Sequence, residues 1–287
     1  MNYLLCEAPI CVGSPTQGSE YAFEKLVEHG LADVFGGRAE LARFQGARTA
    51  PSVLCDPRLH DLETVMLVNR ALFATLTGAF KRGYFPITVG GDHSIAISTI
   101  SALAHTVGAE NTAVIYIDGH TDINTEQTTL TGFIHGMPLA AAMGLCTDKL
   151  TVGSQTVNLY GENTFIVGAR SIDDPEYDIV EQQGVHLYTA DTIRERGIDA
   201  VLDEILTKTA DKRIHLCLDV DSMDGAEFPS TGYVMPDGLS FDTVYRMIER
   251  ILQAGRVASF ECVEYNPLLD TDGSDREKLF RLFRLFK

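Results

Sequence analysis

No run of about 18 apolar residues occurs in this sequence, so we expect no membrane-spanning helix. Residues 1–10, MNYLLCEAPI, lack the basic segment and the full apolar core of a secretory signal peptide. Long linkers rich in Pro, Ser or Gly, low-complexity tracts and repeats of roughly 20–50 residues are also missing. The sequence therefore predicts a single domain spanning residues 1–287, in a protein of the cytoplasm.

Basic side chains are scarce as well. Lys and Arg number 23 against 40 Asp and Glu, which gives a formal net charge of −17. A field of this sign repels phosphate, so we expect neither nucleic acid nor an anionic membrane surface as a partner. The acidity is typical of a solvated surface, and it is also what carboxylates gathered around cations would produce.

Cysteine is present without any disulfide or zinc pattern. The six Cys include no CxxC pair and are too sparse for a secreted disulfide scaffold. Cys217 and Cys262 lie inside apolar runs, which is typical of unreactive core thiols.

Short apolar, β-branched runs alternate with longer amphipathic stretches along the chain. The runs predict strands at 3–8, 85–89, 113–118, 164–167, 185–188, 214–219 and 257–263. The stretches predict helices at 62–82, 94–106, 137–145, 175–183, 200–209, 241–253 and 274–286. This order predicts an α/β fold of three layers, a doubly wound, mostly parallel sheet with helices on both faces. Ligands of such sheets bind beyond the carboxyl ends of the strands.

Ionisable side chains follow four of the predicted strands at that same end. The segments are GGDHS at 90–94, DGHTD at 118–122, DVDSMD at 219–224 and VEYNP at 263–267. Carboxylates collected at one sheet edge repel each other and raise each other's pKa values, and a pair of divalent cations removes that conflict. The candidate metal ligands are His93, Asp118, His120, Asp122, Asp219 and Asp221.

The composition of this ligand set indicates the metal. Carboxylate and imidazole without thiolate suit Mn²⁺ better than Zn²⁺, Fe²⁺ or Co²⁺. Six ligands are too many for one tetrahedral site and fit two ions about 3.5–4 Å apart that share bridging carboxylates. Two such ions activate water as a nucleophile, which is the chemistry of a metal-dependent hydrolase.

Taken together and in this order, the motifs resemble those of the arginase/agmatinase (ureohydrolase) family. The resemblance spans residues 90–267 and includes HGMP at 135–138. Within the family the sequence most resembles the arginases, because the segment DINTEQTTLTGFIHG at 122–136 places Asn124 two residues and His135 thirteen residues after Asp122.

The resemblance implies a role for each matching position. One Mn²⁺ would bind His93, Asp118, Asp122 and Asp219, and the other Asp118, His120, Asp219 and Asp221. Asn124 and Thr131 would contact the substrate α-carboxylate and Asp173 its α-ammonium, with Asp174 as the alternative to Asp173. Glu264 would pair with the guanidinium, and His135 would shuttle protons.

The sequence departs from the family pattern at two positions near these motifs. Gly119 stands where the family usually has Ala, which loosens the backbone. Tyr233 stands where the family usually has a Thr that lies near the guanidinium in arginases. A Tyr at this position could narrow the pocket or change its substrate preference.

Four functions follow as hypotheses. The first is an arginase that converts L-arginine and water to L-ornithine and urea, and the second is a sister ureohydrolase acting on agmatine, guanidinobutyrate or another guanidino acid. The third is a one-metal amide hydrolase of the histone-deacetylase type, and the fourth is a catalytically silent binding protein. The family resemblance also implies a homo-oligomer, either a trimer or a hexamer.

Overall fold

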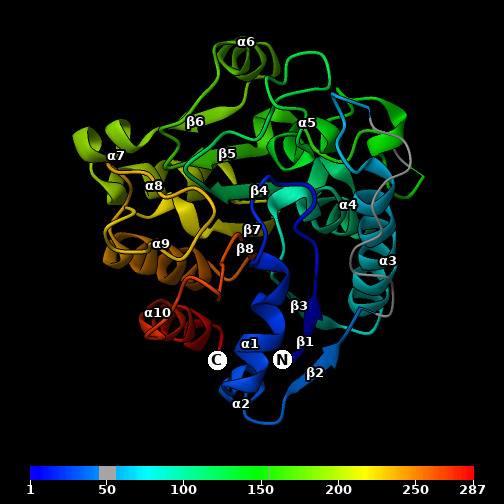
Figure 1. Cartoon of the computed structure of the whole chain (residues 1–287). Coiled ribbons are helices and arrows are strands. Elements are labelled where there is room, and N and C mark those ends of the chain that lie inside the picture. The colour runs from blue at the N-terminus through cyan, green and yellow to red at the C-terminus, as the bar shows by residue number, and fades with distance from the viewer. Residues whose placement is uncertain (45–55, 155) are drawn as a thin grey trace.

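The computed structural model describes residues 1–44, 56–154 and 156–287, and its described strands form one eight-stranded sheet (Figure 1). All seven strand pairings are parallel, in the order β2-β1-β3-β8-β7-β4-β5-β6. The strands are β1 Asn2–Glu7, β2 Ala39–Ala42, β3 Tyr84–Val89, β4 Thr112–Ile117, β5 Thr164–Val167, β6 His186–Tyr188, β7 Arg213–Asp219 and β8 Val257–Val263. The predicted α/β class with a parallel sheet is confirmed.

Helices cover both faces of this sheet. They are α1 Ala22–Glu28, α2 Leu31–Val34, α3 Leu62–Lys81, α4 Ala96–Val107, α5 Pro138–Ala142, α6 Asp174–Gln183, α7 Ala190–Arg196, α8 Ile198–Lys208, α9 Phe241–Gln253 and α10 Ser274–Phe283. Alternate strand residues point to opposite faces, so one core forms under α1, α2 and α7–α10 and two further cores form under α3–α6 (Figure 1). The three layers that the sequence predicts are therefore present.

Four elements were not predicted from the sequence. Strand β2 at the sheet edge and helices α1, α2 and α7 are short, and β2 has no fully buried residue. Two predicted helices are shorter than expected, because the helix expected at 137–145 is only α5, and α10 ends at Phe283 before a 3₁₀ turn at Arg284–Phe286.

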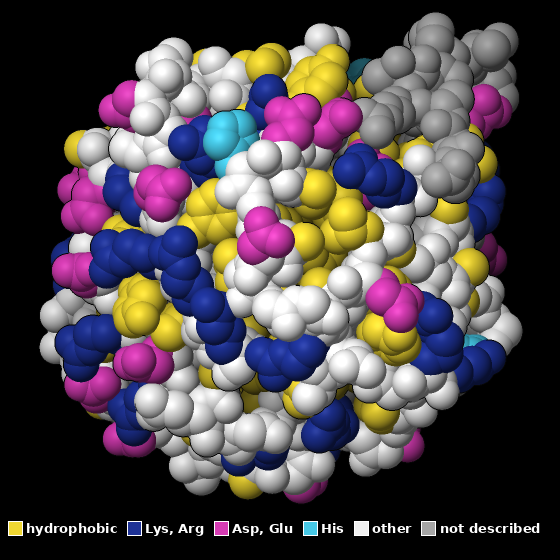
Figure 2. All heavy atoms as spheres, turned by 90° about the horizontal axis from the view of Figure 1, so that it is seen from below, with side chains coloured by type: hydrophobic (Ala, Val, Ile, Leu, Met, Phe, Trp, Pro, Cys, Tyr) yellow, Lys and Arg dark blue, Asp and Glu magenta, His cyan; other side chains and the backbone are white. Residues whose placement is uncertain are grey.

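The two termini lie near each other on one side of the molecule (Figure 1), and Figure 2 shows that side. Lys and Arg side chains gather there around apolar groups although the whole chain is acidic. A cavity of about 350 Å³ on this side is lined by apolar side chains such as Tyr3 and Phe85, with Arg38 and Lys287 beside them. The negative charge is thus unevenly distributed over the surface.

The structure also bears on the expectations about the cysteines and about membrane-spanning helices. Five cysteines are free thiols, four of them buried, and Cys55 lies outside the described residues. No helix within the described ranges is both long and apolar enough to cross a membrane.

Candidate metal centre and substrate pocket

The strands that deliver the candidate ligands and Glu264 are consecutive in the sheet, in the order β3, β8, β7, β4. After β3 the chain turns at Gly91, which has φ +83° and where an added Cβ would lie 2.4 Å from the Ala8 carbonyl oxygen. Only glycine fits this turn, which brings His93 to the sheet edge. Asp122 and Glu264 have φ values of 48° and 61°, which are uncommon outside glycine. Strained backbone of this kind clusters at functional sites.

The first group of candidate ligands surrounds His93. Its Nδ1 lies 2.9 Å from Asp118 Oδ2, 3.3 Å from Asp122 Oδ2 and 3.2 Å from Asp219 Oδ2. The side chain of His93 is 1% exposed, so one imidazole nitrogen faces three carboxylates away from water.

The second group surrounds His120. Its Nδ1 lies 3.1 Å from Asp221 Oδ2 and 3.5 Å from Asp118 Oδ1. Asp118 thus presents one oxygen to each group, which is the geometry of a carboxylate that bridges two cations. Asp219 lies between the groups, because its Oδ2 faces His93 while its Oδ1 accepts a hydrogen bond from the backbone nitrogen of Asp221 at 2.8 Å.

The buried carboxylates of these two groups favour the binding of cations. Burial, with the neighbouring charges of Asp221 and Asp118, raises the pKa of Asp219 well above its ordinary value. Burial opposes the charged form of His93, but the acidic groups around it outweigh burial and raise its pKa well above the usual range. Divalent cations would replace the protons that these shifts favour.

Two observations show whether the residues fit metal ions: buried polar atoms without a hydrogen bond, and the kinds of ligand atoms present. His93 Nδ1 and Asp118 Oδ2 are buried and make no hydrogen bond within the described residues. His93, Asp118 and Asp219 form one compact group of possible ligands, and Asp118, His120 and Asp221 form another. Imidazole and carboxylate are the donors that Mn²⁺ accepts, so the residues present fit a two-metal centre.

A buried chain of polar groups lies behind His93, and the sequence did not indicate it. His93 Nε2 is 3.4 Å from Glu261 Oε1, and Glu261 Oε2 is 3.5 Å from His215 Nε2. Thr99 Oγ1 donates to the same Glu261 oxygen at 2.5 Å, and His215 Nδ1 contacts Ser259 Oγ at 2.7 Å. Burial alone would raise the pKa of Glu261, but His215 and His93 hold it well below its ordinary value. Glu261 is therefore a charged group that faces the outer nitrogen of a candidate ligand.

Cys217 also lies close to His93 and Glu261. Burial raises the pKa of its thiol well above the usual range. Cys217 belongs to neither of the two groups that share Asp118, and the donors of those groups are all nitrogen and oxygen.

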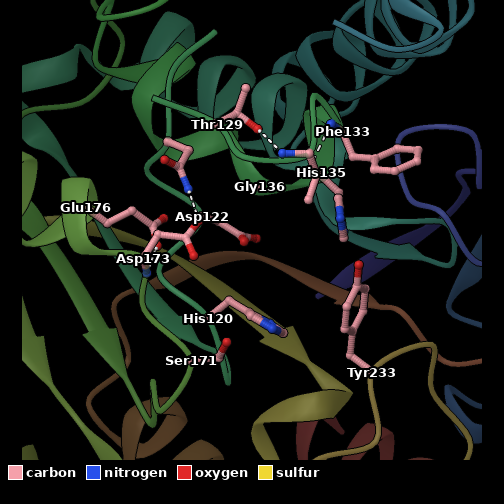
Figure 3. A pocket seen from close by; sticks show the side chains of 12 residues that line it. His120, Asp122, Thr129, Phe133, His135, Gly136, Ser171, Asp173, Glu176 and Tyr233 are labelled. Atoms are coloured by element: carbon pink, nitrogen blue, oxygen red, sulfur yellow. Dashed lines mark hydrogen bonds between the residues drawn. The ribbon is translucent and has the colours of Figure 1, made fainter. Parts of the chain in front are cut away.

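A cavity of about 170 Å³ opens beside the two groups (Figure 3). Its walls are His120, Asp122, Asn124, Thr129, Thr131, Phe133, His135, Gly136, Ser171, Asp173, Glu176 and Tyr233. The three residues predicted to bind the substrate α-groups, Asn124, Thr131 and Asp173, all line it.

The pocket wall is connected to the start of α6. Asn124 Nδ2 donates to Asp173 Oδ2 at 3.0 Å, and Asp173 forms a capping box with Glu176. Asp174, the alternative to Asp173, lies in the first turn of α6 and does not line the cavity in the described part of the chain. Thr129, Phe133 and Ser171 were not singled out from the sequence, because loop residues without a motif give no signal there. Glu176, in the first turn of α6, was not singled out either.

Glu264 does not line this cavity in the described part of the chain. Its side chain is 4% exposed, its Oε1 lies 3.4 Å from His135 Nδ1, and the same oxygen accepts a hydrogen bond from the backbone nitrogen of His93 at 3.0 Å. His135, which contacts Glu264, and Tyr233 both line the cavity, with ring centroids 5.7 Å apart (Figure 3).

The fold and the site define an α/β protein whose sheet edge carries two adjoining groups of metal ligands beside a polar pocket. The chain belongs to the arginase family, since the model of that family matches residues 18–280. It is thus an enzyme of the ureohydrolase class, which hydrolyses C–N bonds, and its family implies a binuclear metal centre.

Individual relatives and solved structures agree with the family. The chain is 34% identical to the arginase of Bacillus caldovelox over 243 residues, which are 84% of this chain and 78% of that protein. It is 36% identical to the arginase of Brevibacillus brevis over 214 residues, 74% of this chain and 71% of that protein. The native structure of the Bacillus caldovelox arginase superposes with a TM-score of 0.93 at 29% identity, covering 99% and 98% of the two chains. A structure of arginase from Entamoeba histolytica in complex with L-ornithine gives a TM-score of 0.87 at 26% identity, covering 99% of this chain and 97% of that one.

Proposed function

We propose that this chain is a manganese-dependent arginase that hydrolyses L-arginine to L-ornithine and urea. The observation that carries the proposal is the convergence of two groups of ligands that share the buried Asp118, beside a pocket lined by Asn124, Thr131 and Asp173. The names of the relatives support the choice of substrate.

Two Mn²⁺ ions would be held at the sheet edge. One would bind His93, Asp118, Asp122 and Asp219, and the other would bind Asp118, His120, Asp219 and Asp221, with Asp118 and Asp219 shared. The distances from His93 Nδ1 and His120 Nδ1 to these carboxylates support this division. The chemistry that two bound divalent ions supply is the activation of water as a nucleophile near neutral pH.

The side chains of the pocket would orient the substrate. Asn124 and Thr131 would donate hydrogen bonds to the α-carboxylate, and Asp173 would accept from the α-ammonium, since Asn124 and Asp173 lie together on one wall. Glu264 would hold the N–H donors of the guanidinium in one orientation. His135 would give a proton to the departing amine nitrogen, which a histidine can do near neutral pH.

A urea-release assay tests the proposal. The Mn²⁺-loaded protein is expected to release urea and L-ornithine from L-arginine, and the metal-stripped protein is expected to release neither until Mn²⁺ is restored. Full activity after complete metal removal contradicts the proposal. A bound-metal content near one ion per chain would instead favour the one-metal hydrolase, and metal binding without hydrolysis of any guanidino compound would favour the silent binding protein.

Tyr233 favours a second candidate, a sister ureohydrolase for another guanidino compound, because a bulky side chain occupies the pocket wall where the family usually has Thr. Parallel assays with L-arginine, agmatine and guanidinobutyrate separate the two. Agmatine lacks the α-carboxylate, so faster turnover of agmatine would overturn the roles given to Asn124 and Thr131.

We also propose, from the family resemblance, that the protein acts in the cytoplasm as a homo-oligomer, either a trimer or a hexamer. Light scattering coupled to size-exclusion chromatography tests the assembly. A mass equal to one chain of 31.4 kDa contradicts it.

A further inference from the structure

The segment that carries Tyr233 is fixed beside Glu264. Thr231 pairs with Tyr265, the residue after Glu264, in an antiparallel bridge. The backbone nitrogen of Asn266 donates to the Ser230 carbonyl at 2.8 Å, so the two segments run side by side. The intervening Gly232 packs on Thr16, whose Cβ lies 3.0 Å from where a Cβ on that glycine would be. Tyr233 is thus held in place by its neighbours.

The ring of Tyr233 lies next to both histidines of the pocket (Figure 3). It is stacked with His135, at a centroid distance of 5.7 Å and an interplanar angle of 30°. It meets His120 edge to face, at 5.4 Å and 76°. In Figure 3 its hydroxyl end points toward His135.

His135 contacts both Glu264 and the ring of Tyr233. Its Nδ1 lies 3.4 Å from Glu264 Oε1 while its ring lies along Tyr233. An imidazole in this position is a planar N–H donor between a carboxylate and an aromatic ring. A guanidinium that pairs with Glu264 would lie next to this imidazole, and it has the same properties, being planar, delocalised and a donor of N–H bonds.

We propose that Tyr233 is a specificity-determining residue whose ring selects a planar, cationic head group. The inference rests on the proposed function, because it concerns how a guanidino substrate enters that site. A guanidinium that pairs with Glu264 beside His135 would gain the face of Tyr233 as well, since guanidinium groups stack on aromatic rings. A tetrahedral ammonium cannot lie flat against the ring, and a Thr at this position would offer no ring.

Three variants separate the ring from the hydroxyl and from pocket shape. Tyr233→Phe keeps the ring, Tyr233→Leu keeps much of the bulk without the ring, and Tyr233→Thr restores the usual residue of the family. The control is Tyr160→Leu, at a tyrosine that is 45% exposed and does not line the described pocket. Thermal unfolding of each variant checks that it is folded.

The measurement compares L-arginine with L-lysine on the Mn²⁺-loaded enzyme. These amino acids share their α-groups and differ in the planarity of the cationic head, so KM for L-arginine and the inhibition constant of L-lysine report on the ring. Tyr233→Leu and Tyr233→Thr are expected to raise KM for L-arginine about tenfold, with a smaller change in kcat. The inhibition constant of L-lysine is expected to change less than about threefold in the same variants. Tyr233→Phe and the control are expected to stay within about threefold of the unaltered chain.

Two results overturn the inference. Equal weakening of L-arginine and L-lysine by Tyr233→Leu would mean that the side chain only shapes the pocket, and a loss as large in Tyr233→Phe would assign the effect to the hydroxyl. Calorimetric titration of L-arginine into the metal-stripped full chain measures the same preference without turnover. Ring-dependent binding without urea release from the Mn²⁺-loaded chain would contradict the proposed function alone, whereas urea release that is indifferent to Tyr233→Leu would contradict this inference alone.

Discussion

At the scale of single residues, the motif DVDSMD contains two carboxylates with different surroundings. Asp221 faces His120, whereas Asp224 accepts hydrogen bonds from the backbone nitrogens of Ala226 and Gly238 at 2.9 and 3.1 Å. The motif alone does not distinguish a metal ligand from a carboxylate that stabilises a turn.

The first prediction uses this difference. Asp221→Asn is expected to lower kcat/KM for urea release at least about 100-fold, because loss of groups that only support metal ligands already costs about 10–100-fold. Asp224→Asn is the matched control, expected to retain activity within a few-fold while losing about 1 kcal/mol of unfolding free energy. Activity assays and chemical denaturation measure both. Equal loss of activity in the two variants would contradict the assignment.

Glu261 gives the second prediction. Its carboxylate faces His93 Nε2 and so fixes the ring orientation that turns Nδ1 toward Asp118 and Asp219. Glu261→Gln is expected to weaken Mn²⁺ binding about 10- to 100-fold. Equilibrium dialysis with metal analysis measures the dissociation constants. Glu162→Gln, at an exposed position, is the control, and unchanged metal affinity in Glu261→Gln would show that Glu261 has no part in orienting His93.

The six candidate ligands could be predicted from the sequence because motifs follow predicted strands, whereas Glu261 and His215 could not. Both lie inside buried strands, β8 and β7, and their meeting depends on which strands pair. The register that sets Cys217 opposite Glu261 and His215 opposite Ser259 is a property of the folded sheet. This register cannot be derived from the spacing of residues in the sequence.

At the scale of elements, the apolar strands and amphipathic helices were found where their patterns predicted them, and the failures have local causes. Strand β2 has no fully buried residue, so it has no apolar run to recognise. Helices α1 and α2 are separated only by a short turn through Gly30, whose φ is +95°. Helix α7 spans only seven residues before Gly197, so it is too short to show a typical amphipathic pattern.

The third prediction concerns the start of α6. Glu176 accepts hydrogen bonds from the backbone nitrogens of Asp173 at 2.9 Å and Ile123 at 3.2 Å, so it ties the helix to the segment after Asp122. Glu176→Ala is expected to lower the unfolding free energy by about 1–2 kcal/mol. Because Asp173 lines the pocket, KM for L-arginine is expected to rise more than kcat falls. Glu181→Ala, at an exposed position of the same helix, is the control. An unaltered KM in Glu176→Ala would mean that the helix cap does not position Asp173 for substrate binding.

At the scale of the whole molecule, the acidic charge and the metal centre are connected. The chain carries a net charge of −17, and its candidate site holds carboxylates that repel one another when no cation is bound. Folding of the metal-free chain must therefore bury these groups at a cost in free energy. Metal ions that bind only the folded chain offset that cost by mass action.

The fourth prediction follows from this linkage and also tests the expected single domain. Free Mn²⁺ at about 100 times the dissociation constant stabilises the folded chain by about 2.7 kcal/mol for each site. In a chain of this size that corresponds to a rise in Tm of about 5–10 °C for each site, measured by calorimetry with and without a chelator. One transition is expected in both states, and two separate transitions would contradict a single domain.

The rise in Tm that Mn²⁺ produces is expected to depend on pH. Burial, with the neighbouring carboxylates, raises the pKa of Asp219 above its ordinary value in the metal-free chain, and the acidic groups around His93 raise its pKa in spite of burial. Protons therefore compete with metal as the pH falls. The rise in Tm produced by Mn²⁺ is therefore expected to be full at a pH above these pKa values and to shrink on acidification. Asp221→Asn, which lacks one ligand, is expected to show a smaller rise than Asp224→Asn at every pH. A rise that does not depend on pH, or that is equal in the two variants, would mean that Mn²⁺ stabilises the chain from some other site.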